Sequence, residues 1–244
     1  MKAIRLILFL LYPLVGVAQD EKVSVRKAVE GNTKQEYFLI NHSAGVKPDG
    51  GYKLLLVLPG GDGSADFNPF VTNLGKHAAG KDYLVAQLVS VKWTPDQKII
   101  WPTEKSRVKK AKFTTEEFVD AVINDIQKNH KINPEHIYTL AWSSSGPAAY
   151  AASLEVDEIK GSFIAMSVFK PDQLSKLSNA KGHRYYLYHS PEDKVCPIRM
   201  ARDAERELSG ADAEVEFSTY AGGHGWHGNI FGAIRAGIGW LEER

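Results

Sequence analysis

Hydrophobic residues recur along this chain in two patterns, one typical of strands and one typical of helices. The aliphatic run 53–58 is nearly continuous, as expected for a strand buried on both faces of a sheet. Further strands are predicted at 22–29, 36–40, 83–89, 137–140, 159–166, 184–189 and 213–220. Helices are predicted at 68–79, at 147–152, at 196–208, at 231–241, and from a capping box at 114–117 up to Asn133-Pro134.

The order of these elements indicates the fold class. Strands alternate with helices over most of the chain, which favours an α/β fold with a mostly parallel sheet of about eight strands and helices on both faces. No internal repeat or linker marks a second domain, so one domain is predicted over residues 19–244. The longest irregular stretch, 92–113, is expected to form a small lid or pocket wall, and no segment leaves room for a large cap domain.

Residues 1–18 differ from the rest of the chain. Two basic residues, Lys2 and Arg5, precede an apolar stretch at 6–17 that ends in small residues before Ala18. This pattern is typical of a secretory signal peptide, and the apolar stretch is shorter than the roughly 20 residues of a membrane span. We expect cleavage after Ala18 and a secreted or periplasmic protein; an uncleaved membrane anchor is the alternative.

Charge and cysteine content exclude several classes of function. The formal net charge is +1 for the whole chain and becomes −1 without Lys2 and Arg5, so no broad attraction to nucleic acid or to an anionic membrane is expected. Cys196 is the only cysteine, so no internal disulfide can form. The chain has no His-Glu-x-x-His motif and no Cys–His ligand cluster, and neither a metal nor an organic cofactor is expected. A basic run at 105–112 is most simply a solvated loop, and no feature indicates an oligomeric state.

A serine-rich turn at 141–146 follows a predicted strand and leads directly into a helix of small residues. A strand, a tight turn with a central serine and a helix together form an arrangement that exposes a hydroxyl for nucleophilic attack. Ser143 is the preferred nucleophile because small residues, Ala141 and Ser145, lie two positions before and after it. Ser144 is less suitable, since a bulky tryptophan would occupy the first of those positions. The alternative is a helix N-terminus whose hydroxyls only cap backbone N–H groups.

A loop with two carboxylates follows the aromatic strand predicted at 184–189. Asp193 is the better candidate to hold a histidine, and its neighbour Glu192 is the fallback. A position directly after a strand is where a parallel sheet presents functional groups. The alternative is that both acids decorate a solvated turn.

A glycine-rich loop after the strand predicted at 213–220 carries a histidine. Glycines lie on both sides of His224 and let the chain turn tightly, which aims the imidazole back over the edge of the sheet. We predict His224 as the general base, and His227, at the start of the last helix, is the weaker candidate. Ser143, Asp193 and His224 follow each other in this order, each after its own strand.

The buried strand at 53–58 ends in a further glycine-rich turn at 59–63. Such a turn leaves backbone N–H groups unobstructed by side chains. The alternative is a phosphate-binding loop, but no Gly-Lys-Ser/Thr follows and the Rossmann spacing is absent.

Together these four motifs resemble those of the α/β-hydrolase superfamily, in particular its compact serine esterases of the dienelactone hydrolase, carboxylesterase and feruloyl-esterase kind. The resemblance covers about residues 50–244. It implies an α/β-hydrolase fold without a large cap domain, and the chain order Ser, Asp, His is that of this superfamily. The chain departs from the pattern because positions 141 and 145 are not glycine and because Pro59 stands where many relatives have histidine.

The resemblance also implies a function. We expect a serine hydrolase that cleaves carboxylic esters, small or polymer-linked, through an acyl-enzyme on Ser143. Asp193 would orient His224, and the backbone N–H groups of Gly61 and Ser144 would bind the oxyanion. Two rival functions stay open, namely a non-catalytic binding protein with the hydrolase fold and a serine peptidase that uses the same residues.

Three tryptophans are candidates for substrate binding. Trp101, Trp142 and Trp226 lie in or near the loops that follow the predicted strands. Core filling is the alternative for at least one of them.

Overall fold

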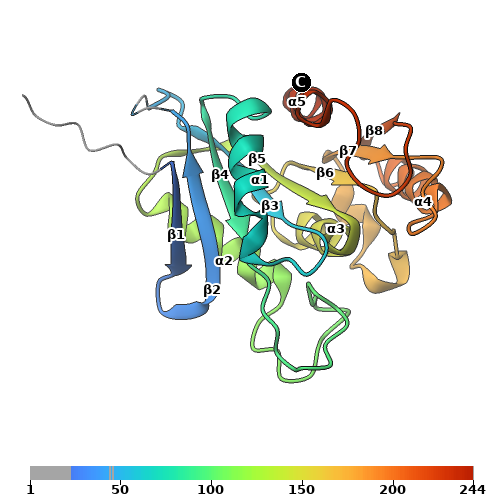
Figure 1. Ribbon diagram of the computed structural model, residues 1–244, viewed down its shortest axis with the longest axis horizontal. Helices are drawn as coiled ribbons and strands as arrows, with labels where there is room; N and C mark the ends of the chain where they lie inside the picture. The colour runs from blue at the N-terminus through green and yellow to red at the C-terminus, as the bar shows by residue number, and fades with distance from the viewer. Residues whose placement is uncertain (1–22, 44, 46, 244) are drawn as a thin grey trace, which may run out of the picture.

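The computed structural model describes residues 23–43, 45 and 47–243, so the leader predicted at 1–18 lies outside the described residues. The central feature is one eight-stranded sheet (Figure 1). Its strands are β1 (Ser24–Val29), β2 (Asn32–Asn41), β3 (Tyr52–Leu58), β4 (Tyr83–Leu88), β5 (Ile132–Trp142), β6 (Gly161–Ala165), β7 (Arg184–His189) and β8 (Glu214–Thr219). They lie in the order β1-β2-β4-β3-β5-β6-β7-β8, and only the pairs β1–β2 and β2–β4 are antiparallel. The prediction of a mostly parallel sheet of about eight strands is confirmed.

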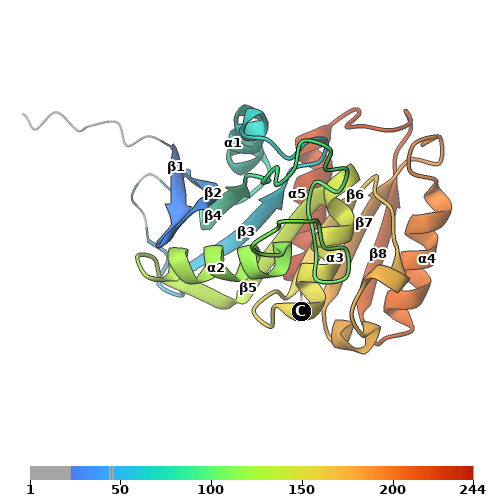
Figure 2. The same ribbon diagram turned by 90° about the horizontal axis from the view of Figure 1, so that it is seen from below.

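Helices cover both faces of this sheet. They are α1 (Asn68–His77), α2 (Thr115–Gln127), α3 (Gly146–Glu155), α4 (Ile198–Ser209) and α5 (Ile230–Glu242). Residues of α1 and α5 belong to one apolar cluster, and residues of α2, α3 and α4 belong to a second cluster on the opposite face (Figure 2). The predicted α/β arrangement is therefore confirmed. Among the described residues, no helix is both long enough and apolar enough to cross a membrane.

The strand β3 is buried on both of its faces. Leu54, Leu56 and Leu58 pack in the cluster of α2 and α3, while Leu55 and Val57 pack in the cluster of α1 and α5. All five side chains are completely buried. This double burial explains the aliphatic run. Because β3 lies near the middle of the strand order, the glycine-rich turn after it lies near the middle of the sheet's carboxyl edge.

The helix α2 begins as predicted and ends earlier than predicted. Thr114 Oγ1 accepts the N–H of Glu117, and the Glu117 carboxylate accepts the N–H of Thr114. The expectation that the helix continues to Asn133-Pro134 is wrong, because α2 ends at Gln127 and these residues lie in the first part of β5. The register between β3 and β5 shifts in this region, and an irregular strand start can accommodate a proline, which lacks an N–H.

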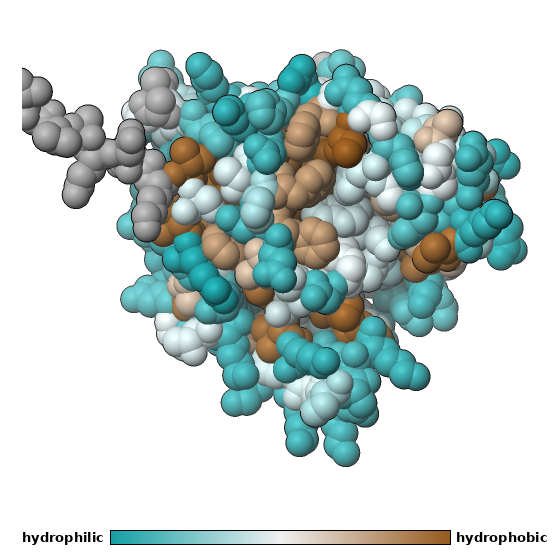
Figure 3. Space-filling model, in the orientation of Figure 1, coloured by the Kyte–Doolittle hydropathy of each residue, from teal (hydrophilic) through white to brown (hydrophobic). Residues whose placement is uncertain are grey.

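Between β4 and α2 the described chain forms neither helix nor strand, as predicted. We call residues 89–113 the projecting loop because they extend away from the sheet in Figure 1, and mostly hydrophilic side chains cover the projection (Figure 3). Trp101 anchors the loop, since its indole Nε1–H donates to the carbonyl oxygen of Pro59 at 2.9 Å. The projecting loop is therefore fixed against the turn that follows β3.

Candidate active site

Ser143 occupies a strained turn between β5 and α3. Its backbone φ is +56°, a left-handed conformation that is costly for a residue other than glycine. Ser143 is partly exposed, whereas Trp142 and Ser145 on either side of the turn are buried. The turn therefore presents one hydroxyl at the carboxyl edge of the sheet, at the residue that the sequence favours.

Two contacts hold this turn in place from the side of β6. Ser167 donates its Oγ–H to the carbonyl oxygen of Ser143 at 2.6 Å. A Cβ atom added to Gly146 would overlap the Oγ and Cβ atoms of Ser167, so this close approach requires glycine. The surrounding structure thus maintains the strained φ of Ser143.

Ser145 joins the same turn to β3. Its Oγ lies 2.6 Å from the carbonyl oxygen of Leu58, and it accepts the N–H of Trp142 at 3.1 Å. Ala141, on the other side of the nucleophile, is completely buried. Small residues are therefore tolerated at both positions, and the serine supplies a hydrogen bond to β3 that glycine could not make.

The imidazole of His224 lies between Ser143 and Asp193. Ser143 Oγ is 3.0 Å from His224 Nε2, and Asp193 Oδ2 is 2.8 Å from His224 Nδ1. If Nδ1 is protonated and donates a hydrogen bond to Asp193, Nε2 is free to accept the proton of the serine hydroxyl. Glu192 is exposed and His227 stacks against an aromatic ring, so neither fallback candidate belongs to this arrangement.

Asp193 is a completely buried carboxylate that accepts several hydrogen bonds. Its Oδ1 accepts the backbone N–H groups of Val195 and Cys196, both at 2.8 Å. Burial alone raises the pKa of Asp193, but the hydrogen bonds from Cys196, His224 and Val195 outweigh it and hold this pKa below its usual range. An ionised carboxylate at this place orients the imidazole and stabilises its protonated form.

The sequence analysis missed a second histidine of the site, the buried His189 at the end of β7. Its Nε2 lies 2.7 Å from the carbonyl oxygen of Cys196, a distance that requires the proton on Nε2, and 3.4 Å from Asp193 Oδ2. Burial lowers the pKa of His189. The neutral ring therefore supports the loop that carries Asp193. Its place at a strand end, four residues before Asp193, does not distinguish this role from that of an ordinary buried polar residue.

The acid loop and the histidine loop are joined by Ser190. Its buried Oγ accepts the N–H groups of Glu192 and Gly223, both at 3.1 Å. Gly222, Gly223 and Gly225 have φ values of +119°, +78° and +124°. Because such conformations favour glycine, the tight turn predicted around His224 from its glycines is confirmed.

The turn after β3 lies against the serine turn. Ser144 donates its Oγ–H to the carbonyl oxygen of Gly61 at 2.8 Å. The N–H of Gly61 has no acceptor among the described residues, and the N–H of Ser144 lies at the start of a helical turn, where N–H groups lack intrahelical partners. The two N–H groups predicted to bind an oxyanion therefore belong to adjacent turns.

The three candidate tryptophans lie at different depths. Trp101 and Trp142 are only 4% and 6% exposed, and they pack closely against Gly63 and Gly60 of the turn after β3. Core filling, the alternative in the sequence analysis, describes these two side chains. Trp226 is half-buried among aromatic rings of α1, β5 and β7, and its contact with substrate stays a prediction.

One group of possible metal ligands exists in the described part of the chain, and it consists of Asp193, Cys196 and His224. Burial and then the charge of Asp193 raise the pKa of the Cys196 thiol to about 11. At neutral pH this thiol is protonated and therefore a poor ligand. The Nδ1 atom of His224 already faces Asp193, so the donor set fits a hydrogen-bonded catalytic arrangement better than a metal site.

No protein-family model and no curated protein matches this chain. Solved structures do match it. An α/β-hydrolase enzyme from a Medee basin deep-sea metagenome library is 16% identical, with a TM-score of 0.59 over 83% of each chain. Thermogutta terrifontis esterase 2 phosphoramylated by tabun is 12% identical, with a TM-score of 0.65 over 91% of this chain and 97% of that chain. A carboxylesterase from Mesorhizobium loti is 15% identical, with a TM-score of 0.65 over 91% of this chain and 100% of that chain.

These likenesses define the fold. The chain has the α/β-hydrolase fold, which confirms the fold implied by the resemblance of its motifs.

Proposed function

We propose that this chain is a serine hydrolase of carboxylic esters, with Ser143 as nucleophile, His224 as general base and Asp193 as the residue that orients the base. The observation that carries the proposal is the pair of contacts at His224, 3.0 Å to Ser143 Oγ and 2.8 Å to Asp193 Oδ2. The strained backbone of Ser143 supports it, as do the esterases among the solved structures of similar fold.

The first half of the reaction transfers the acyl group to Ser143. As its Oγ attacks the ester carbonyl carbon, the hydroxyl proton passes to His224 Nε2, and Asp193 stabilises the imidazolium. The carbonyl oxygen becomes an oxyanion that accepts hydrogen bonds from the N–H groups of Gly61 and Ser144. The bond between the carbonyl carbon and the alkoxy oxygen then breaks, and His224 gives its proton to the leaving alcohol.

The second half of the reaction transfers the acyl group to water. His224 takes a proton from water as the water oxygen attacks the acyl-enzyme, and the same two N–H groups bind the second oxyanion. Its collapse returns the proton to Ser143 and releases the acid. Neither half requires a metal or an organic cofactor.

A fluorophosphonate probe tests the nucleophile. We expect a single adduct on Ser143, located by peptide mass spectrometry, and we expect its loss in Ser143→Ala. Ser144→Ala is the matched control, because it removes the adjacent exposed hydroxyl and should keep the adduct. An adduct on Ser144 would contradict the assigned nucleophile, and no adduct on the folded protein would favour the non-catalytic binding protein.

The peptidase alternative is tested with an ester and an amide of the same acid. Para-nitrophenyl acetate and para-nitroacetanilide have the same acyl group and comparable chromophores. We expect hydrolysis of the ester and a far slower reaction of the anilide. Comparable rates would favour a peptidase. The non-catalytic alternative gives no chemical reason for the contacts of Asp193 and His224 with each other.

We propose further that the protein acts outside the cytoplasm after removal of a leader near Ala18. The basic and apolar pattern of residues 1–18 supports this proposal. The test separates medium, periplasm and membranes of the producing cells and identifies the N-terminal residue of the protein in each fraction by mass spectrometry. A mature chain that begins at Gln19 in the medium or periplasm is expected, and an intact Met1 in the membrane fraction would contradict it.

A further inference from the structure

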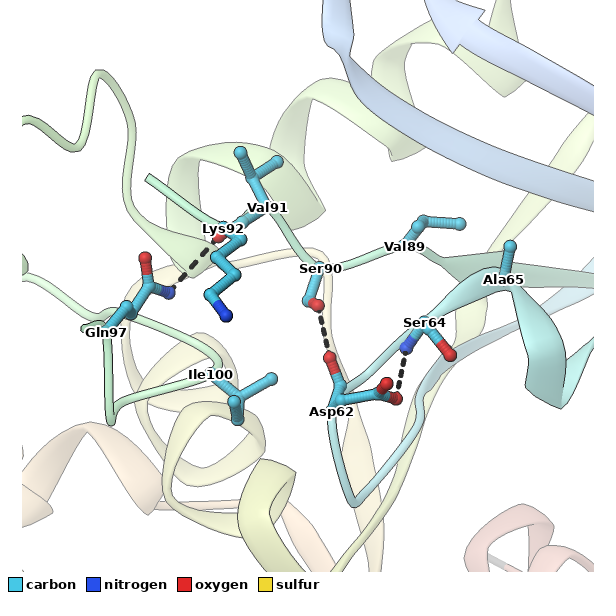
Figure 4. Close-up of a pocket in the computed structure, with 9 residues that line it drawn as sticks. All are labelled: Asp62, Ser64, Ala65, Val89, Ser90, Val91, Lys92, Gln97 and Ile100. Carbon is cyan, nitrogen blue, oxygen red and sulfur yellow. Dashed lines mark hydrogen bonds between the residues drawn. The ribbon is translucent and has the colours of Figure 1, made fainter. Parts of the chain in front are cut away.

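A cavity of about 300 Å³ adjoins the turn that follows β3 (Figure 4). Its walls come from that turn and from the first half of the projecting loop, and they include Asp62, Ser64, Val89, Ser90, Lys92 and Ile100. The same turn carries Gly61, whose N–H is one of the groups proposed to bind the oxyanion. One part of an ester held at Ser143 can therefore extend toward this cavity.

The order of the strands indicates whether the acyl part or the alcohol part of the ester extends toward the cavity. The loops after β3 and β4 form the cavity, and both strands lie on one side of β5, which carries Ser143. His224 follows β8, on the other side of β5. The leaving alcohol must lie near His224, because this residue protonates it. The acyl part therefore extends away from His224, toward the cavity.

An exposed lysine, Lys92, lines the cavity and has no counter-ion among the described residues. No ion pair of the described residues includes Lys92. Figure 4 shows this side chain between Gln97 and Ser90, pointing toward Ile100. Gln97 fixes the local chain by accepting the N–H of Trp93 at 2.7 Å and by donating to carbonyls of the same loop. The ammonium group is thus available to a ligand.

The projecting loop that carries Lys92 is strongly basic. Residues 89–113 hold seven Lys or Arg residues and two acidic residues, whereas the whole chain holds 30 and 29. Arg107 pairs with Glu104, and the lysines of this loop form no ion pair with any described residue. The surface of the projection is correspondingly hydrophilic (Figure 3). Of these seven residues only Lys92 lines the cavity, and the net positive charge of the loop attracts anions and accelerates their association.

A carboxylate limits where a bound anion can lie. Asp62 follows Gly61 directly, so it lies at the end of the cavity nearest the serine, and its Oδ1 accepts the N–H of Ser64 at 3.0 Å. A second negative charge would be repelled near Asp62 and attracted near Lys92. An anionic acyl chain must therefore be long enough to carry its charge past Asp62.

We infer that the site prefers esters whose acyl group carries a distal carboxylate, which Lys92 binds and which the basic projecting loop attracts. This inference rests on the proposed esterase function and assigns a substrate class to it.

The test compares two para-nitrophenyl esters that differ in charge. Mono-para-nitrophenyl adipate has a free carboxylate, and methyl para-nitrophenyl adipate has a neutral methyl ester in its place. At low ionic strength we expect a kcat/KM about tenfold higher for the anionic monoester, because a charged hydrogen bond contributes to its binding, and we expect added salt to reduce this preference. Lys92→Gln should remove most of the preference, Lys92→Arg should keep it and Asp62→Asn should increase it. Lys98→Gln removes a charge of the same loop outside the cavity and should change the preference less than about twofold.

The outcomes separate the inference from the function on which it rests. Equal rates for the two esters, or a preference that Lys92→Gln and Lys98→Gln alter equally, would overturn the inference and leave the esterase function intact. So would a charge preference seen only on the alcohol side, measured with para-acetoxybenzoate against its methyl ester. No hydrolysis of any of these esters would refute the esterase function itself.

Discussion

Ser145 donates a hydrogen bond from its Oγ to the carbonyl oxygen of Leu58 at 2.6 Å. Leu58 ends β3 directly before the turn that carries Gly61, and Ser145 belongs to the turn that carries Ser143. The bond therefore fixes the proposed nucleophile relative to the proposed oxyanion-binding turn. Both residues are completely buried, so water does not compete for this bond.

Replacing Ser145 with alanine should destabilise the protein. The change leaves the buried carbonyl of Leu58 without this donor, and we expect a loss of about 1–3 kcal/mol in the free energy of unfolding, measured by urea denaturation. Ser144→Ala is the control, because the bond of its hydroxyl to the carbonyl oxygen of Gly61 is exposed and water can replace it, and its effect should stay within about 0.5 kcal/mol. Equal effects of the two variants would show that the bond to β3 is not what stabilises the turn.

Replacing Asp193 with asparagine should abolish most of the activity without unfolding the protein. An amide can keep the hydrogen bonds from Val195 and Cys196, but it can also present an N–H to His224 and favour the wrong tautomer. We expect kcat on a para-nitrophenyl ester to fall by about 10³–10⁴-fold. Glu192→Gln changes the neighbouring exposed acid and should leave kcat unchanged. A similar loss in both variants would contradict the role of Asp193.

Gly146 and Ser167 should be coupled in stability. A methyl group at Gly146 would overlap Ser167, so Gly146→Ala should cost about 1–3 kcal/mol. Ser167→Gly removes the obstructing atoms, and the double variant should be more stable than the sum of the single effects implies. A double-mutant cycle by urea denaturation measures this coupling. Strict additivity would exclude the direct contact as the cause.

Most of the fold and the three central site residues follow from the sequence, because parallel strands bring their carboxyl ends to one edge. The loops after β5, β7 and β8 therefore had to meet, and glycines around His224 indicated a tight turn there. The end of α2 was predicted too late because Asn133-Pro134 resembles a helix stop. The structure uses that proline at an irregular strand start instead.

The supporting residues of the site could not be predicted in the same way. Ser190 and Ser167 each bond a backbone atom of a loop far away in the chain, and His189 bonds the carbonyl oxygen of Cys196 in the loop that follows it. Such bonds depend on side-chain rotamers and on how the loops fold. A serine or histidine at a strand end has no local pattern that distinguishes this role from an ordinary buried polar residue.

The stability of the protein should fall as the pH decreases from about 7.5 to about 5. Burial lowers the folded pKa of His189 below the value of about 6.5 for an unfolded chain. As the pH falls through that range, the unfolded chain binds a proton that the folded chain does not bind, so the free energy of unfolding decreases. His189→Gln keeps a donor for Cys196 and should reduce this pH dependence in urea denaturation, whereas His227→Gln, at an exposed position, should not. An unchanged pH dependence in His189→Gln would contradict the assignment.

Cys196 should react slowly with alkylating agents while the protein is folded. Burial and the charge of Asp193 raise the pKa of its thiol to about 11, and the thiolate is the reactive form. At about pH 8 an unfolded cysteine, with a pKa of about 8.5, is partly ionised, whereas this thiol is almost entirely protonated. We expect iodoacetamide to modify the native protein at least tenfold more slowly than the urea-unfolded protein, followed by intact mass spectrometry. Asp193→Asn removes the nearby negative charge and should accelerate the native reaction modestly. Rapid alkylation of the native wild type would show that Cys196 is an ionised, accessible thiol, and it would reopen the metal-ligand role that its protonated state argues against.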